Sequence, residues 1–329
     1  MIEILSQTAL ATVQDLGRVG ALGFGVGTSG AMDNLALAAG NLLLGNAEGD
    51  AGVEVQVFPF DVRFQAACTF AVTGADCGAT LDGVPVLPWW VCAARAGQVL
   101  QLRPPRVAAW RGSRAYLCLA GGVDVPVALG SRSTQLRGAF GGHAGRALRQ
   151  GDVLPVGAAG AAPRAVGFGV QPAGLVEPLL QDGLPAIRVM PAAEHDCYTP
   201  DSRAAFWQQP WKITPQSDRY GFRLAGPSLT PTVPLELRSH GIVPGVIQVP
   251  HGGQPIVQMR DAQPTGGYPK IGTVIDADLW RLGQAPIGSQ IRFVACDWAG
   301  AQQASAWNRR YLDDIRRLTA LYRGLRDRG

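Results

Sequence analysis

The sequence predicts a mainly β protein. Short runs of alternating apolar and polar residues, or of β-branched residues, recur along the chain. Glycine (43 residues) and proline (24 residues) separate these runs, and few segments have helical spacing. Many short strands with few helices favour β-barrels or sandwiches over a doubly wound parallel sheet.

The predicted strands lie in both halves of the chain. In the first half, residues 60–64 alternate strictly, residues 69–73 and 98–102 are short β-type runs, and Asp82-Gly83 is a hairpin turn signal. The same pattern returns in four runs of the second half, at residues 186–190, 245–249, 255–259 and 290–294.

The stretch GVGTSGAMD at residues 25–33 contains G-x-G-x-x-G but does not predict a dinucleotide site. Glycines and charges in residues 14–24 interrupt any strand that would lead into it. Asp33 is a suitable N-cap for a helix over residues 34–44, whose apolar residues recur on one face. Such a Gly-rich helix start exposes N–H groups to an anion, and a plain capped helix is an equal alternative.

With 329 residues the chain is long enough for two domains. Residues 156–185 are rich in Ala, Gly and Pro and poor in charge, which is typical of a linker. We therefore expect a β domain at residues 1–160, a linker at 161–185 and a second β domain at 186–300. Thr199 and Pro200 predict a helix start in the second domain, and apolar residues at helical spacing predict a C-terminal helix over 301–329.

Composition narrows the class of protein. With 47% hydrophobic and 16% charged residues the chain is globular, and a net charge of +4, spread along it, argues against a nucleic-acid-binding surface. No run approaches the ~18 apolar residues of a membrane span and no signal peptide is evident, so we expect a cytoplasmic protein. The six cysteines form no C-x-x-C pair, which predicts reduced thiols that are neither disulfides nor metal ligands.

No standard catalytic motif is present: the sequence lacks G-x-x-x-x-G-K-[ST], G-x-S-x-G and H-E-x-x-H. The four histidines have no metal-ligand spacing, so we expect no metal site. The densest polar stretch is residues 258–271, QMRDAQPTGGYPKI, in which Gly266 and Gly267 let the backbone approach a ligand closely. Its groups for hydrogen bonding and charge are Asp261, Gln263, Thr265, Tyr268 and Lys270.

This inventory suits a small polar substrate. The alternative is a wide hairpin with Lys270 at its solvated end. Upstream, Arg219 and Arg223 stand four residues apart, and they form either a clamp for a carboxylate or phosphate or two solvated side chains.

Six segments, in order over nearly the whole chain, together resemble the biotin-dependent carboxyltransferase family, also called allophanate hydrolase subunit 2 or the antagonist of the kinase inhibitor KipI. They are TVQDLGRVG at Thr12, SGAMD at Ser29, LAGGVDVPVALGSRST at Leu119, GGHAGRALRQGD at Gly141, SDRYGFRLAGP at Ser217 and IQVPHGGQPIVQMRDAQPTGGYPKI at Ile247. The last segment is the most specific, because a long run of unusual polar and glycine residues seldom recurs by chance.

The resemblance implies two cyclophilin-like β-barrel domains and a role as the C-type subunit of a hetero-oligomeric, ATP-dependent 5-oxoprolinase, which converts 5-oxoproline to glutamate. It implies a partner of the KipI or allophanate hydrolase subunit 1 type and a third, LamB/YcsF-type subunit for ring opening. ATP then acts at the level of the complex.

Two alternatives stay open. In the first, the chain is a carboxyltransferase component that moves a carboxyl group from carboxybiotin to urea or a related amide. Biotin would then arrive on a partner, because Lys212 and Lys270 are the only lysines and neither lies in a Met-Lys-Met type acceptor. In the second, the chain is a non-catalytic antagonist that binds a KipI-like inhibitor.

Both chemistries handle a planar amide whose oxygen gains negative charge, which requires preorganised donors. We expect Lys270 to be such a donor and Asp261 to be a base or an orienting carboxylate. The substrate-binding residues expected around them are Arg219, Arg223, Gln263, Thr265, Gly266, Gly267 and Tyr268.

Overall fold

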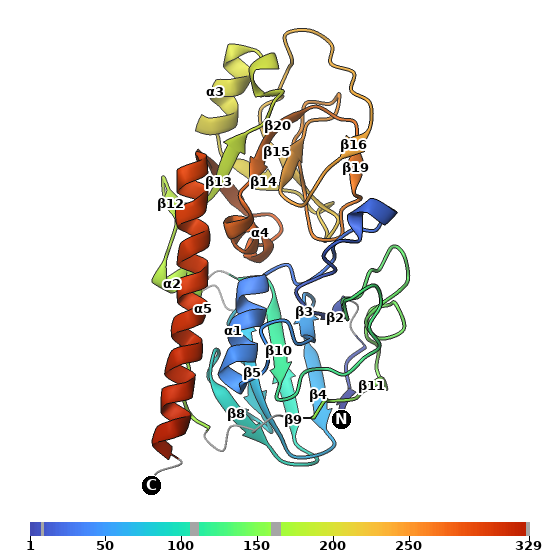
Figure 1. The fold of residues 1–329 in the computed structure, drawn as a ribbon, viewed down its shortest axis with the longest axis vertical. Coiled ribbons are helices and arrows are strands. Elements are labelled where there is room, and N and C mark those ends of the chain that lie inside the picture. Colours follow the sequence, from blue (N-terminus) through green and yellow to red (C-terminus); the bar gives the residue numbers. More distant parts are fainter. Residues whose placement is uncertain (8–9, 106–111, 159–165, 327–329) are drawn as a thin grey trace. The chain divides into compact units, whose positions relative to one another are not determined.

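The computed structural model describes residues 1–7, 10–105, 112–158 and 166–326 (Figure 1). The chain divides into two compact units. Unit 1 consists of Met1–Arg18, Ser29–Glu177 and Arg309–Gly329, and unit 2 of Val19–Thr28 and Pro178–Asn308. Residues 159–165, in which the predicted linker begins, lie outside the described residues.

Unit 1 contains two antiparallel sheets, with strand orders β11-β1-β4-β9-β6-β7 and β2-β3-β10-β5-β8. The strands of the larger sheet are β1 (Ile2–Ile4), β4 (Phe60–Phe64), β6 (Thr80–Leu81), β7 (Val84–Pro85), β9 (Val99–Leu102) and β11 (Val153–Leu154). Those of the smaller sheet are β2 (Ala11–Gln14), β3 (Gly52–Val55), β5 (Cys68–Gly74), β8 (Val91–Ala94) and β10 (Ala115–Leu119).

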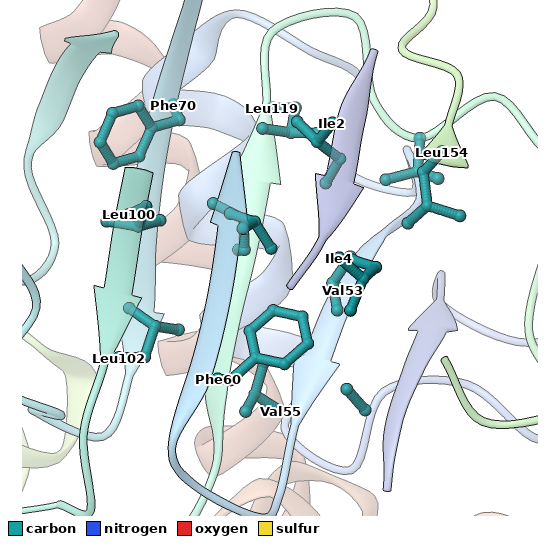
Figure 2. Packing of buried hydrophobic residues seen from close by; sticks show 14 of the residues in the cluster. Ile2, Ile4, Val53, Val55, Phe60, Phe70, Leu100, Leu102, Leu119 and Leu154 are labelled. Atoms are coloured by element: carbon teal, nitrogen blue, oxygen red, sulfur yellow. The ribbon is translucent and has the colours of Figure 1, made fainter. Parts of the chain in front are cut away.

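The two sheets of unit 1 enclose one apolar core. Along β4 the side chains of Phe60, Val62 and Phe64 are buried, while Arg63 is exposed, as its alternating sequence predicts. Figure 2 shows residues of both sheets meeting in this core. They include Ile2, Ile4, Val53, Val55, Phe70, Leu100, Leu102, Leu119 and Leu154. The predicted turn at Asp82-Gly83 joins β6 to β7, and both of its residues have positive φ.

The predicted helix after Asp33 is confirmed as α1 (Asn34–Leu44), and the Asp33 carboxylate accepts the Ala36 N–H at 2.8 Å. The expectation of a single apolar face is wrong, because every residue from Leu35 to Leu44 is buried. The helix packs on the smaller sheet on one side and shares a cluster with Ile315 of the C-terminal helix. At Gly40 the approach to the sheet is so close that a Cβ atom would lie 2.6 Å from Cys118 Sγ.

A buried polar network fixes the start of α1 to unit 1. The Tyr116 hydroxyl on β10 donates to Glu54 Oε2 on β3 at 2.8 Å and accepts the Asp33 N–H at 2.7 Å. Glu54 Oε2 also accepts the Met32 N–H at 2.8 Å, and Arg114 Nε lies 4.0 Å from the same carboxylate. Burial, with the neighbouring charge of Glu54, raises the pKa of Tyr116, so this phenol stays protonated and can donate.

Unit 2 contains a closed barrel. Seven strands follow the order β13-β20-β17-β18-β15-β14-β21, and β21 pairs back in parallel with β13. They are β13 (Leu184–Pro191), β14 (Trp211–Ile213), β15 (Gly221–Ala225), β17 (Val246–Gln248), β18 (Ile256–Gln258), β20 (Lys270–Val274) and β21 (Gln290–Ala295). β12 (Leu180–Gln181) extends β13, while β16 (His240–Gly241) and β19 (Thr265–Gly266) form a separate two-stranded ribbon.

Short helices complete unit 2: η1 (Leu22–Phe24), η2 (His195–Cys197), η3 (Asp276–Asp278), α3 (Pro200–Gln208) and α4 (Leu279–Gln284). The predicted helix start is confirmed, since the Thr199 side chain accepts the Ser202 N–H at the start of α3. α3 brings Phe206 onto Phe293 of β21, with ring centroids 5.0 Å apart.

The predicted C-terminal helix is confirmed as α5, Trp298–Arg326, which begins before residue 301. Its residues to Asn308 belong to unit 2, and those from Arg309 belong to unit 1, as does α2 (Ala173–Val176). Within unit 1 the Tyr311 hydroxyl donates to the Gln171 carbonyl at 2.7 Å. The predicted mainly β fold with a few short helices and a C-terminal helix is thus confirmed, and unit 2 forms one of the two expected barrels, closed by seven strands.

None of the described helices has the length and apolarity needed to cross a membrane. All six cysteine thiols are free. Burial raises the pKa of Cys77 and of Cys118 to about 12, so both thiols remain protonated at neutral pH.

We predict that Tyr116→Phe lowers the free energy of unfolding by about 1–3 kcal/mol, the cost of leaving the buried Asp33 N–H without its acceptor. Urea unfolding followed by circular dichroism measures this change. The matched control is Tyr268→Phe, since Tyr268 is 46% exposed, and it should shift stability by less than about 0.5 kcal/mol. Equal effects of the two variants would show that the network contributes nothing to stability.

Candidate functional site

The polar stretch predicted as the site connects two strands that are not neighbours. β18 ends at Gln258 and β20 begins at Lys270, but β17 lies between them in the barrel. The connection over residues 259–269 therefore crosses β17 and contributes β19, which pairs with β16. The alternative of a wide hairpin is wrong, because a hairpin would pair β18 directly with β20.

A buried ion pair holds the beginning of this connection. Arg219 and Asp261 are each 5% exposed, and the guanidinium grips both carboxylate oxygens, with Nε–Oδ2 at 2.9 Å and Nη2–Oδ1 at 3.0 Å. The Asp261 N–H also donates to the Arg219 carbonyl at 2.9 Å. The Tyr220 hydroxyl next to this pair donates to Gln263 Oε1. The turn before β15 thus fixes the position of the connection after β18.

The two predicted arginines stand in different environments. Arg219 is buried against Asp261, whereas Arg223 lies on β15 with an exposed side chain between buried Phe222 and Leu224. Arg219 is already occupied by a carboxylate of the protein itself. A shared clamp of the two guanidinium groups for one anion is therefore not formed in this arrangement.

Lys270 lies at the other end of the connection and is 8% exposed, not solvated. Its Nζ donates to the Tyr268 carbonyl at 3.1 Å and lies 3.8 Å from Glu194 Oε2. The same Glu194 oxygen accepts the Lys270 backbone N–H at 3.0 Å. Burial lowers the pKa of Lys270, and the Glu194 carboxylate offsets part of this effect.

Between these two anchors the connection lines a depression of about 560 Å³. The predicted residues that line it are Gln263, Thr265, Gly266, Gly267 and Tyr268. The rest of its wall comes from Leu235, Glu236, Leu237, Ser239, His251 and Pro269. Arg219, Arg223, Asp261 and Lys270 are not part of this wall.

A smaller hollow of about 180 Å³ adjoins the depression and shares Leu235, Glu236, His251 and Pro269 with it. Its other residues are mostly apolar: Tyr198, Leu229, Pro231, Pro234, Val249 and Pro250. The two hollows together offer one polar and one apolar compartment, which is the usual composition of a small-molecule site.

The described wall of the depression carries one carboxylate, Glu236, one imidazole, His251, and otherwise neutral hydrogen-bonding groups. No lysine or arginine is among these lining residues. Such a lining suits a neutral polar ligand better than a polyphosphate, which proteins bind with arginine, lysine or a helix N-terminus. Among the described residues no group of three or more His, Cys, Asp or Glu side chains could hold a metal ion.

Sequence reasoning missed Glu194, Glu236 and His251. Glu194 and Glu236 lie in segments without any local motif, and only the barrel topology brings them to the connection. His251 had a signal, because it stands in the run VPHGGQP directly before β18. Its lack of metal-ligand spacing favoured a structural interpretation, but it lines both hollows.

Known proteins are similar to this chain along nearly its whole length. The chain is 42% identical over 318 residues to the C-type subunit of 5-oxoprolinase from Haemophilus influenzae, covering 97% of this chain and 98% of that protein. It is 41% identical over 315 residues to the C-type subunit of 5-oxoprolinase from Escherichia coli, covering 96% and 97%.

A solved structure of the same fold is the urea amidolyase of Kluyveromyces lactis, with a TM-score of 0.85 at 28% identity. The match covers 95% of this chain but only 20% of that longer protein. Residues 24–295 match the family described as carboxyltransferase domain, subdomain A and B, and the chain belongs to this family.

Proposed function

We propose that this chain is the C-type subunit of a hetero-oligomeric, ATP-dependent 5-oxoprolinase that converts 5-oxoproline to glutamate. The observation that supports this most strongly is the 42% identity to the C-type 5-oxoprolinase subunit of Haemophilus influenzae over almost the full length of both chains. The hydrogen-bonding lining of the depression, which carries the carboxylate of Glu236 and no lysine or arginine, supports it as well, because the reacting group of 5-oxoproline is an uncharged lactam.

In this proposal the depression in unit 2 holds the amide. Gln263, Thr265, Gly266, Gly267 and Tyr268 bind the substrate from this wall. Lys270 is not part of the wall but donates to the carbonyl of Tyr268, which is, and we assign to its ammonium group the stabilisation of the amide oxygen as it gains negative charge. Both oxygens of Asp261 accept hydrogen bonds from Arg219, so Asp261 acts as an orienting carboxylate and not as a base. Arg223, which is exposed on β15, contacts a carboxylate of the substrate or of a partner protein.

The residues of the depression do not fit ATP, because no lysine, arginine or Gly-rich phosphate loop is among the described residues that line it. We infer that another subunit binds ATP, and that the partners are a KipI or allophanate hydrolase subunit 1-like protein and a LamB/YcsF-type subunit. The chain then contributes amide binding to a reaction that the complex completes.

A second candidate function is carboxyl transfer from carboxybiotin to urea or a related amide. The structural similarity to a urea amidolyase over 95% of this chain favours it. The ureido ring of biotin is a planar, uncharged group that the same hydrogen-bonding lining also fits, and biotin would be attached to a partner chain.

The reconstituted complex decides between these functions. We expect the chain, mixed with its two partner subunits and ATP, to form glutamate from 5-oxoproline. ATP consumption without glutamate would contradict the proposal, and biotin-dependent carboxylation of urea would establish the second candidate. A third result, binding of a KipI-like partner with no turnover of either substrate, would identify a non-catalytic antagonist.

Lys270→Met should lower turnover by the complex by about 10²–10³-fold, the usual effect of removing one preorganised donor. The chain provides a matched control in its other lysine, Lys212, which is exposed on β14. Lys212→Met should leave the rate within about threefold, since a solvated surface charge contributes little. If both variants fold and assemble and their rates agree, Lys270 has no part in the chemistry. Asp261→Asn is a poor test, because it leaves Arg219 buried without its carboxylate and destabilises the loop itself.

The pKa of Lys270 should lie below that of a free lysine side chain, because burial disfavours the ammonium form. In the Lys212→Arg variant Lys270 is the single lysine, so reductive ¹³C-methylation and a pH titration by NMR report on it, with the α-amino group resolved by its own shift. If turnover requires the ammonium form, the turnover rate is highest at a pH below this pKa and falls as the pH rises through it. A titration midpoint at or above that of a methylated reference peptide would contradict the argument.

A further inference from the structure

Two buried amide side chains lie under the wall of the depression. Gln248 on β17 is 2% exposed and Gln258 on β18 is 4% exposed, and Gln258 Nε2 donates to Gln248 Oε1 at 3.0 Å. Gln248 Nε2 and Gln258 Oε1 have no hydrogen-bond partner among the described residues. Buried polar atoms are nearly always paired, so two orphans in one side-chain pair require an explanation.

Gln248 and Gln258 lie on one side of the sheet, and Gln248 packs against Gly266 of the depression wall. Ile247 and Val257, which stand opposite each other in the β17–β18 ladder, are fully buried, and side chains alternate along a strand. Gln248 and Gln258 therefore point to the other side of the sheet, where Gly266 lies. A Cβ atom on Gly266 would lie 2.4 Å from Gln248 Nε2, and Gly266 lines the depression. One glycine thus separates the amide pair from the proposed site.

We propose that Gln248 and Gln258 recognise a cis amide, with Gln248 Nε2 donating to the ligand carbonyl and Gln258 Oε1 accepting the ligand N–H. This inference rests on the proposed function and names the chemical class of the substrate. A lactam holds its C=O and N–H on the same side, and urea offers the same pair of groups. A ketone or an N-alkylated lactam does not.

The match does not depend on how the two amides are oriented. Two primary amides that share one hydrogen bond always leave one donor and one acceptor facing outward. Reversing both side chains exchanges the roles of Gln248 and Gln258 but preserves the complementarity to a cis amide.

Access to the pair requires movement of the ribbon formed by β16 and β19. This ribbon stands outside the closed barrel, and its ladder consists of the pairs His240↔Gly266 and Gly241↔Thr265. One further bond joins the Ile242 N–H to the Pro264 carbonyl at 2.9 Å. Lifting the ribbon breaks the bonds of this ladder and leaves every barrel pairing intact.

Titration of the full-length chain by NMR tests the proposal, with 2-pyrrolidinone and N-methyl-2-pyrrolidinone as probes. The second probe lacks the N–H, so we expect it to bind about tenfold more weakly, the usual effect of one lost hydrogen bond at a buried group. In the double variant Gln248→Met/Gln258→Met both amides are gone and no polar atom is stranded, so the protein should fold and this tenfold ratio should fall to about one. The control double variant Gln302→Met/Gln303→Met, on exposed positions of α5, should keep the ratio.

Three results would overturn the inference. The two probes bind the wild-type chain equally, neither probe binds, or the tenfold ratio survives in a folded Gln248→Met/Gln258→Met variant. Pairing of the two orphans by water alone gives one of these results. Glutamate formation by the complex is measured separately, so the inference can fail while the proposed function stands. If the complex carboxylates urea instead, the function fails, and a urea titration of the same variants still decides whether the pair binds a cis amide.

Discussion

The candidate site depends on the buried ion pair between Arg219 and Asp261. Two charges that are each 5% exposed are stable only when they satisfy each other, and the bidentate geometry with its two bonds near 3 Å does so. Removing either partner strands the other charge, which typically costs about 3–5 kcal/mol. The pair therefore fixes the position of the connection as it leaves β18. Its arginine belongs to the turn before β15, 42 residues earlier in the sequence.

The far end of the same connection has a second ionic anchor, at Lys270 and Glu194. Here one carboxylate oxygen accepts the Lys270 backbone N–H and also faces its ammonium group. Between the two anchors the chain crosses β17 and presents Gly266 and Gly267 to the depression. Both positions need glycine because the backbone passes close to other groups there. A Cβ atom on Gly266 would lie 2.4 Å from Gln248 Nε2, and one on Gly267 would lie 2.8 Å from the Leu237 carbonyl oxygen.

Local patterns predicted much of the fold. The alternation at residues 60–64, the caps at Asp33 and Thr199 and the turn at Asp82-Gly83 depend on neighbours in the sequence, and each is found where the pattern indicated. The burial of α1 on all sides could not be predicted in this way. It follows from packing between a sheet and a helix that starts more than 250 residues later.

The same distinction applies to the site. The composition of residues 258–271 marked the segment that lines the depression, because glycines and polar groups there exceed what a plain turn needs. The ion-pair partners could not be predicted from the sequence. The crossing of the connection over β17 brings Asp261 to Arg219 and Lys270 to Glu194. The spacing of Arg219 and Arg223, four residues apart, also suggested one clamp. In the fold Arg219 lies buried in a turn, whereas Arg223 occupies an exposed position on β15.

The chemistry of the site explains why such a chain works as one part of a complex. Its depression offers hydrogen bonds and one acidic and one imidazole side chain, while the nearby ammonium group of Lys270 is shared with a carbonyl and a carboxylate. These groups can bind and orient a planar amide, and holding a reactant in place is a large part of catalysis. They do not supply a phosphate-binding loop or an activated nucleophile, which an ATP-dependent opening of an amide also requires. In the proposed 5-oxoprolinase we expect those groups to come from other subunits.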